Sequence, residues 1–366
     1  MINTKATIMI KQLTREYPLF VTIAALAVFM PFEHTIAHSQ MGNILGFLVI
    51  FAVIIYSSLN VAHHAEVLAH KYGEPYGTLI LTSSAVIVEI LIIVIMMTHG
   101  ENATLARDAI YSAVMLDING LLGIAAIIGG IKHGEQAYNV DSTNSYMSMI
   151  LVSIGIAMVL PHFIVEDKLD IYMNFTIVMF ILLYIIFTRI QLKEHRYFFV
   201  YKNDDEERHH DSVEKDKING LYHGLILALS IVFIGLLAEV LAVFMSNNLE
   251  TLGLPMALGA FSVALISASP ELITAIRAAQ NNNMQTVVNI AIGASLATVL
   301  LTIPAILIVG KIMGMDIELA LTPIQGLMLG LTILAGIIHF SDGETNMLEG
   351  FVHLVLFIVF FFLMFV

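Results

Sequence analysis

Two glutamates, Glu89 and Glu271, lie within segments that are otherwise almost entirely apolar. Each follows a Gly-x-Pro, at residues 73–75 and 253–255, and an identical Ala-Glu-Val-Leu-Ala at residues 65–69 and 238–242 precedes each Gly-x-Pro. A charged side chain at mid-membrane costs about 2.5–3.5 kcal/mol on insertion scales, so it is kept where it has a function. The matched order predicts a duplicated chain with one functional carboxylate in each half.

Burial disfavours the charged form of a carboxyl group, so a buried carboxylate needs either a proton or a cation. The proton and the cation bind the same carboxylate oxygens, so they compete. This competition is the least that is needed to couple the exchange of one for the other. Two glutamates offer at most about four oxygens, whereas Ca²⁺ takes about 6–8, so other oxygens must complete the shell. We expect polar residues near either glutamate, or at similar depth, to support the site: Thr82, Asp117, Asn119, Ser267, Ser269, Thr274, Asn289 and Ser295.

Composition identifies an integral membrane protein. The 366 residues are 58% hydrophobic and 12% charged, and mean hydropathy is +0.88, a balance that a water-soluble surface does not tolerate. Apolar runs of roughly 20 residues predict membrane-spanning helices rather than a barrel. The absence of cysteine excludes thiolate chemistry, and the net charge of −13 argues against a nucleic-acid partner. Eleven spans are expected, near residues 17–35, 43–63, 77–98, 108–130, 147–165, 172–191, 220–246, 254–279, 285–310, 321–339 and 348–366.

The distribution of lysine and arginine predicts the orientation. A cytoplasmic N-terminus puts thirteen of these residues inside and three outside, and eleven spans then put the C-terminus outside. We expect residues 1–36 to hold a cytoplasmic segment and an extra first helix, and residues 192–219 to form an acidic cytoplasmic loop. Residues 37–191 and 220–366 would each form a five-helix repeat, and because five is odd the second repeat is inverted. Inverted repeats are typical of secondary transporters.

Several segments also carry a family resemblance. Residues 73–89, beginning Gly-Glu-Pro-Tyr-Gly, align without gaps with LGETVGGLLNATFGNATE, so that Glu89 falls on its last Glu. Residues 267–271 (Ser-Ala-Ser-Pro-Glu) resemble GNAAE, and residues 341–350 resemble SDGxSNWLEG. These are motifs of the cation/proton exchanger family of the calcium/cation antiporter superfamily. The chain resembles most closely the bacterial ChaA-type branch.

The resemblance implies an all-α polytopic protein of a bacterial inner membrane. It implies alternating access, with Ca²⁺ exported from the cytoplasm in return for protons and with Glu89 and Glu271 binding both. No cofactor is implied, the partners are inorganic cations, protons and the lipid bilayer, and a homo-oligomer stays open. Ala85-Val86 and Ser267-Ala268 stand where calcium exchangers have Gly-Asn. The alternative of Na⁺(K⁺)/H⁺ exchange by the same fold therefore also stays open.

Four further residues are candidates for a proton path or vestibule. Glu66 and Glu239 lie near expected membrane boundaries, where a solvated helix end is the simpler interpretation. His162 and His339 lie late in the fifth and tenth spans, where a histidine bonded to the backbone is equally expected.

Two other functional classes compete with antiport. His63, Glu66 and His70 share a helix face and, with His64, could hold the transition metal of an intramembrane hydrolase, although the run is neither H-E-x-x-H nor H-x-x-E-H. A passive cation channel could also use acid-lined helices. Neither alternative explains two acids in matched, inverted places.

Overall fold

The computed structural model describes residues 16–72, 76–100, 102–191 and 218–366. Nearly all of the predicted acidic loop, residues 192–217, therefore lies outside the described residues, as does the first Gly-x-Pro. Within the described ranges the chain is almost wholly helical. The predicted all-α class is confirmed.

The described residues form eleven membrane-helix segments in the predicted order. Nine are long and apolar enough to cross a membrane, and the last two are shorter apolar helices. The first half comprises α2 (Tyr17–Ala37), α3 (Gln40–Tyr72), α4 (Tyr76–Gly100), α5–η1–α6 (Leu105–Met115, Leu116–Leu121, Leu122–His133), α7–η2–η3 (Val140–Ile154, Gly155–Val159, Leu160–Phe163) and α8 (Glu166–Arg189). The second half comprises α11 (Gly220–Leu252), α12 (Ala257–Gln280), α13–η6–α14 (Met284–Ala297, Thr298–Thr302, Ile303–Met313), α15 (Pro323–His339) and α16 (Met347–Leu363).

Local sequence explains where these helices begin and end. Asparagine side chains accept hydrogen bonds from first-turn N–H groups of α7, α11, α13 and α16, which satisfies donors that a helix start leaves free. Gly253 ends α11 in the left-handed conformation, with φ 61°, which costs glycine least. The second Gly-x-Pro is thus a helix stop that sets the start of α12.

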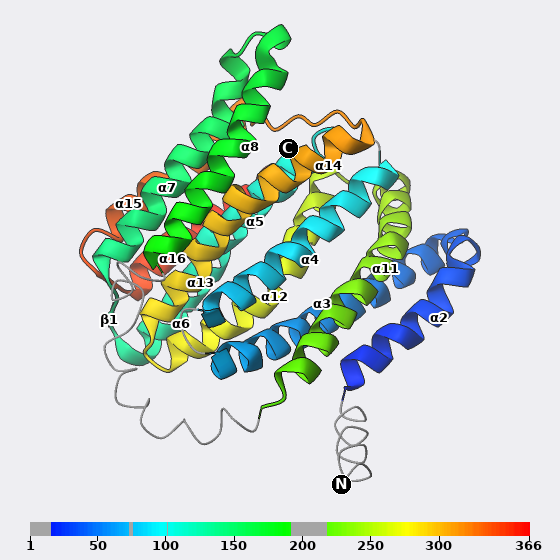
Figure 1. Ribbon diagram of the computed structural model, residues 1–366, viewed down its shortest axis with the longest axis horizontal. Coiled ribbons are helices and arrows are strands. Elements are labelled where there is room, and N and C mark those ends of the chain that lie inside the picture. The colour runs from blue at the N-terminus through cyan, green and yellow to red at the C-terminus, as the bar shows by residue number, and fades with distance from the viewer. Residues whose placement is uncertain (1–15, 73–75, 101, 192–217) are drawn as a thin grey trace.

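The two glutamate-bearing helices lie at the centre of the bundle (Figure 1). Helices α4 and α12 each contact α3, and the long α3 and α11 pack along each other. The extra helix α2 lies on the flank, against α3 and α11. The two broken helices that flank the glutamates, α5–η1–α6 and α13–η6–α14, are the most deeply buried of the spans.

Each broken helix contains a π-helical turn at a matching place. Segment η1 begins at Leu116 and η6 at Thr298, each 27 residues after its glutamate (89 to 116 and 271 to 298). π-turns are rare and frequent at functional sites. Their equal spacing from Glu89 and Glu271 supports the duplication that the sequence predicts.

A short antiparallel ribbon joins one end of the two halves. Strand β1 (Gln136–Ala137) pairs with β2 (Glu344–Thr345), and the Tyr138 hydroxyl donates to the main-chain oxygens of His339 and Glu344. The ribbon fixes the C-terminal end of α6 against the loop that precedes α16.

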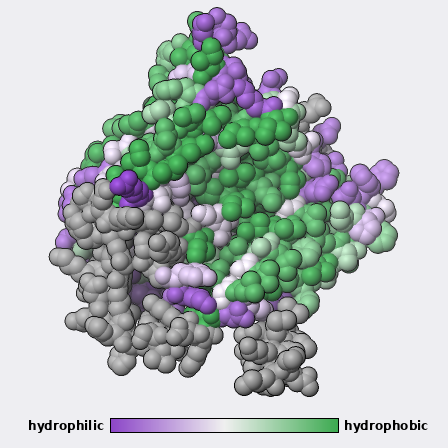
Figure 2. Space-filling model, in the orientation of Figure 1, coloured by the Kyte–Doolittle hydropathy of each residue, from purple (hydrophilic) through white to green (hydrophobic). Residues whose placement is uncertain are grey.

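The surface is that of a membrane protein. Figure 2 shows a broad hydrophobic band across the visible face, with hydrophilic residues gathered toward its margins. Helix α8 contributes exposed apolar side chains to the surface, among them Ile171, Phe175, Leu182 and Ile185. These residues need lipid rather than water around them.

Helices α6 and α16 cross at two glycines. A Cβ atom on Gly350 would lie 2.8 Å from the carbonyl oxygen of Gly123 and 2.8 Å from the backbone nitrogen of Ile127. Both atoms belong to backbone and cannot move aside without moving a helix. Small residues permit this close approach of membrane helices.

We therefore expect Gly350→Ala to lower stability by about 1–3 kcal/mol through overpacking. The matched control is Gly330→Ala on α15, where no described atom lies within 4 Å of the added Cβ. Thermal unfolding of the purified protein in detergent measures both. A Gly350→Ala protein that unfolds at the temperature of Gly330→Ala would contradict the close crossing.

Candidate cation-binding site

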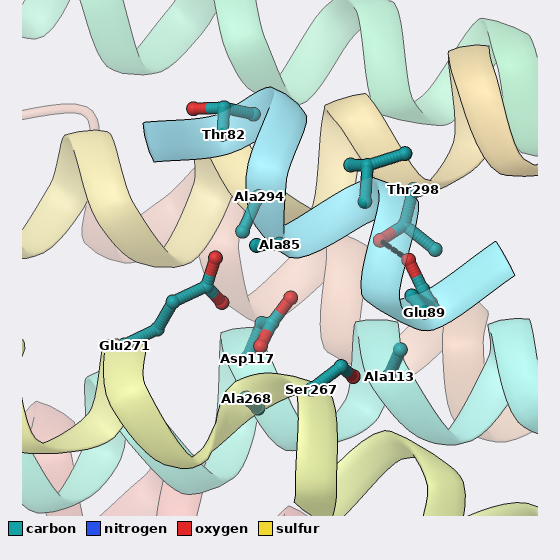
Figure 3. A pocket seen from close by; sticks show the side chains of 11 residues that line it. Thr82, Ala85, Glu89, Ala113, Asp117, Ser267, Ala268, Glu271, Ala294 and Thr298 are labelled. Carbon is teal, nitrogen blue, oxygen red and sulfur yellow. Dashed lines mark hydrogen bonds between the residues drawn. The ribbon is translucent and has the colours of Figure 1, made fainter. Parts of the chain in front are cut away.

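Glu89 and Glu271 line one pocket at the centre of the bundle. The pocket lies between α4, α5–η1, α12 and α13–η6, and its lining consists of Thr82, Ala85, Val86, Glu89, Ala113, Asp117, Ser267, Ala268, Glu271, Ala294 and Thr298. Figure 3 shows the carboxyl groups of Glu271 and Asp117 pointing toward each other across it, with Glu89 at the far side. The two repeats thus bring their acids to one place.

Glu89 is held by hydroxyl groups from the opposite repeat. It is 3% exposed, and its Oε2 accepts hydrogen bonds from Thr298 Oγ1 at 2.9 Å and Thr302 Oγ1 at 3.0 Å. Its Oε1 is buried and has no hydrogen-bond partner among the described residues. Both threonines lie in η6, so the π-turn of the second repeat serves the glutamate of the first. Oε2 of Glu89 is therefore hydrogen-bonded, whereas Oε1 is available to bind a proton or a cation.

Asp117 is a third carboxylate of the same pocket. It lies in η1, is 2% exposed, and its Oδ2 accepts from Ser295 Oγ at 3.1 Å. Its Oδ1 is buried without a partner among the described residues. Glu271 is partly exposed. A buried carboxylate oxygen without a donor is costly and favours a cation or a proton at that atom.

The eight supporting residues divide into those at the pocket and those turned elsewhere. Thr82, Asp117 and Ser267 line the pocket, and Ser295 reaches it through Asp117. Asn119 faces away and donates to Thr332 Oγ1 at 2.8 Å. The other three bond locally or to another helix: Ser269 donates to Leu265 O, Asn289 Oδ1 accepts from Gln285, and Thr274 bonds to Pro270 O and Glu66.

The proton-path candidates lie at different places. Glu66 Oε1 accepts from Thr274 Oγ1 at 3.2 Å, so α3 contacts the site helix α12 about one turn beyond Glu271. Its counterpart Glu239 is exposed on α11. His162 bonds the main-chain oxygen of Leu321, and His339 contacts His353. Glu66 is thus hydrogen-bonded to the helix that carries Glu271.

The histidines of α3 do not converge on one ion. His64 is 1% exposed and turns to Glu16 Oε2 at 3.1 Å and His223 Nδ1 at 2.8 Å, whereas His63 is exposed. Within the described residues, no group of three or more His, Cys, Asp or Glu side chains lies close enough together to hold one metal ion, and this covers the three pocket carboxylates as well as the histidines of α3. The pocket carboxylates would have to move closer together to bind one ion. Burial favours a higher pKa for Glu16, but hydrogen bonds from Tyr222 and His64 outweigh it and lower its pKa. This cluster joins the start of α2 to α3 and α11.

Comparison with known proteins identifies the family. The sequence matches the family described as Sodium/calcium exchanger protein over residues 42–193 and 222–366. The chain belongs to the sodium/calcium exchanger family. It is 32% identical over 310 residues to the sodium-potassium/proton antiporter ChaA of Escherichia coli, covering 83% of this chain and 84% of that protein. It is 23% identical over 310 residues to the Ca²⁺/H⁺ antiporter of Aphanothece halophytica, covering 80% and 83% of the two chains.

Solved structures of this exchanger fold agree. The structure of native YfkE superposes with a TM-score of 0.73 at 19% identity, covering 94% of this chain and 99% of that one. The H⁺/Ca²⁺ exchanger CAX gives a TM-score of 0.66 at 17% identity, covering 95% and 89%. The predicted resemblance and fold class are confirmed. As a member of this exchanger family the chain is a secondary cation/proton transporter and not an enzyme.

Sequence reasoning missed Thr298 and Thr302. Both lie in an apolar span that was expected to supply only Asn289 and Ser295. The sequence did contain one signal. Thr298 stands 27 residues after Glu271, and Leu116, the neighbour of Asp117, stands the same 27 residues after Glu89. Aligning the two repeats beyond the glutamates marks this segment but does not single out the threonines, because they align with Leu116 and Gly120.

Replacing both threonines should destabilise the exchanger. Thr298→Val with Thr302→Val keeps the side-chain volume but removes both donors to Glu89 Oε2, which costs about 1–3 kcal/mol for each unsatisfied group. The matched control is Thr176→Val on α8, also fully buried, whose hydroxyl donates to the main-chain oxygen of Tyr172 within its own helix. Thermal unfolding without added cation compares the two. Equal unfolding temperatures would contradict the importance of the Glu89 hydrogen bonds.

Proposed function

We propose that this protein exports Ca²⁺ from the cytoplasm in exchange for protons, with Glu89 and Glu271 as the groups that bind both. One observation carries the proposal: glutamates from matching places in the two repeats line a single pocket. Alternating access to such a shared site is how inverted repeats move a cation across a membrane.

The exchange follows from competition for the same oxygens. With a cation in the pocket, as many of the carboxylates of Glu89, Glu271 and Asp117 are ionised as are needed to balance its charge. When the cation leaves, an ionised carboxylate in apolar surroundings is unfavourable, so protons take its place. A pocket that holds neither the cation nor protons is then unfavourable, and so is a pocket that holds both. Movement of the cation in one direction therefore requires movement of protons in the other.

The donor set favours a divalent cation. Three carboxylates offer a formal charge of up to −3, and the hydroxyls of Thr82 and Ser267 line the same pocket. Calcium affinity rises with the number of charged oxygen ligands. The alternative is Na⁺(K⁺)/H⁺ exchange, which gains support from the similarity to the sodium-potassium/proton antiporter ChaA of Escherichia coli. Asp117 is the residue we expect to favour Ca²⁺ over monovalent ions.

Glu66 is the best placed of the four proton-path candidates. Its bond to Thr274 sets a carboxylate next to the site helix, on the side of Glu271 nearer the C-terminal end of α12. We assign Glu66, and Glu239 as its counterpart in the second repeat, to the two vestibules. His162 and His339 remain weaker candidates, since His162 is bonded to a main-chain oxygen and His339 contacts another histidine.

The proposal includes the predicted topology. The N-terminus would be cytoplasmic and the C-terminus external in a bacterial inner membrane, with residues 37–191 and 220–366 as inverted repeats on either side of the acidic loop 192–219. The transported ions are cargo, and the scheme involves no resident cofactor. Self-association is not required to bring the three carboxylates together, because Glu89, Asp117 and Glu271 of one chain line the same pocket.

Everted membrane vesicles provide the test. A preformed pH gradient should collapse on addition of Ca²⁺ with the wild-type protein, and Glu89→Gln or Glu271→Gln should each abolish that exchange, because each removes an intramembrane charge that the site needs. Fluorescence of a pH-sensitive dye measures the gradient.

The matched control is Glu344→Gln, which changes an exposed side chain of the short strand β2 and should exchange like wild type. Sodium and potassium are tested in parallel, and a larger response to either than to Ca²⁺ would favour the alternative cargo. Wild-type exchange in both site mutants would refute the site.

A further inference from the structure

A chain of buried polar groups lies behind the pocket, on the far side of η1 from Asp117. Asn119 is fully buried, its amide nitrogen lies 2.8 Å from Thr332 Oγ1, and its amide oxygen lies 3.0 Å from Nδ1 of His353. His353 is 1% exposed on α16. Its other ring nitrogen, Nε2, lies 3.3 Å from Nδ1 of His339.

The donors in this chain can be assigned from chemistry. The Asn119 nitrogen donates to Thr332, so its oxygen accepts, and His353 must carry a proton on Nδ1. Thr332 Oγ1 in turn lies 3.5 Å from the sulfur of Met115, a weak acceptor. The chain of bonds therefore ends at the Asn119 amide and Met115. An amide does not pass a proton on, so the chain is suited to holding η1 rather than to conducting protons.

This series of hydrogen bonds lies where it can affect the geometry of the pocket. Residues two apart on a helix project to opposite sides, so a contact that fixes Asn119 also fixes the direction of Asp117. A π-turn departs from the ordinary helical hydrogen-bond pattern, and its rotational setting depends on side-chain contacts. The Asp117 carboxylate, with one oxygen on Ser295 and one without a described partner, needs that setting.

The backbone around His353 supports the same interpretation. Gly123, just beyond η1, and Gly350, one turn before His353, bring α6 and α16 into backbone contact. A Cβ atom on Gly123 would lie 3.2 Å from Cβ of His353. The imidazole is therefore held at a fixed distance from η1, and its bond to Asn119 links α16 to the pocket.

We propose that His353 is a positioning residue of the exchanger: by donating to Asn119 it fixes the rotation of η1 and so places Asp117 in the cation pocket. The inference rests on the proposed function and adds to it a specific residue outside the pocket. It places part of the control of cation affinity on α16, which supplies no pocket-lining residue.

The test is a Ca²⁺ titration of the purified full-length protein in detergent, with the rise in unfolding temperature as the signal. His353→Leu, which removes the donor, should raise the half-maximal Ca²⁺ concentration about 10-fold, the lower end of the effect of losing a bond that orients a metal ligand. His353→Asn keeps a nitrogen donor in the Nδ1 position but loses the contact with His339. It should stay near wild type.

A double-mutant cycle tests the route through Asn119. Asn119→Ala alone should shift the midpoint, and His353→Leu should add nothing in that background. Ile226→Ala controls for a general loss of stability, because Ile226 packs with Leu19 and Tyr222 in a separate cluster. It should lower the unfolding temperature without moving the midpoint.

Three results would overturn the inference: a wild-type midpoint in His353→Leu, an equal shift in His353→Asn, or multiplicative shifts in the double mutant. If His353→Leu does not fold, Asn119→Ala is compared with His353→Asn instead. The inference then predicts a shifted Ca²⁺ midpoint in Asn119→Ala and a midpoint near wild type in His353→Asn. A wild-type protein whose unfolding temperature responds to none of Ca²⁺, Na⁺ and K⁺ would instead refute the proposed function. The two failures are therefore distinguishable.

Discussion

The structure depends on one constraint: carboxylates inside an apolar bundle must be compensated by a donor, a proton or a cation. Glu89 and Asp117 are almost fully buried, and each has one oxygen bonded to a hydroxyl and one without a described partner. The hydroxyls lower the cost of burial without removing it. The cost that remains favours binding of a proton or a cation, as the proposed transport site requires.

The two repeats meet this constraint differently. In the second repeat, the π-turn η6 supplies Thr298 and Thr302, which hold the glutamate of the first repeat. In the first repeat, η1 supplies Asp117, which adds a charge beside Glu271 instead of a donor. One glutamate is thus fixed and buried, while the other is partly exposed and faces a second acid. The duplication therefore produced a shared pocket with unequal halves.

Much of this was predictable from the sequence, because charges in long apolar spans are few and their spacing is conspicuous. The order of the helices, the central place of Glu89 and Glu271 and the exchanger family all followed from hydropathy, repeats and motifs. The direction of individual polar side chains did not. Ser269 bonds back to its own helix, as serine does in helices, and Asn119 bonds to Thr332 rather than facing the pocket. Thr298, Thr302 and His353 act across helices that are far apart in sequence, and hydropathy alone does not reveal which faces meet.

The central claim is that proton and cation compete for one set of oxygens, and proton release on cation binding tests it most directly. Ca²⁺ is added to the purified protein in weakly buffered detergent solution near neutral pH, and the released protons are counted against the ions bound. We predict that wild type releases protons as Ca²⁺ binds, and that a Glu89→Gln, Glu271→Gln double mutant does not. Saturable Ca²⁺ binding to the wild-type protein without proton release would contradict the account.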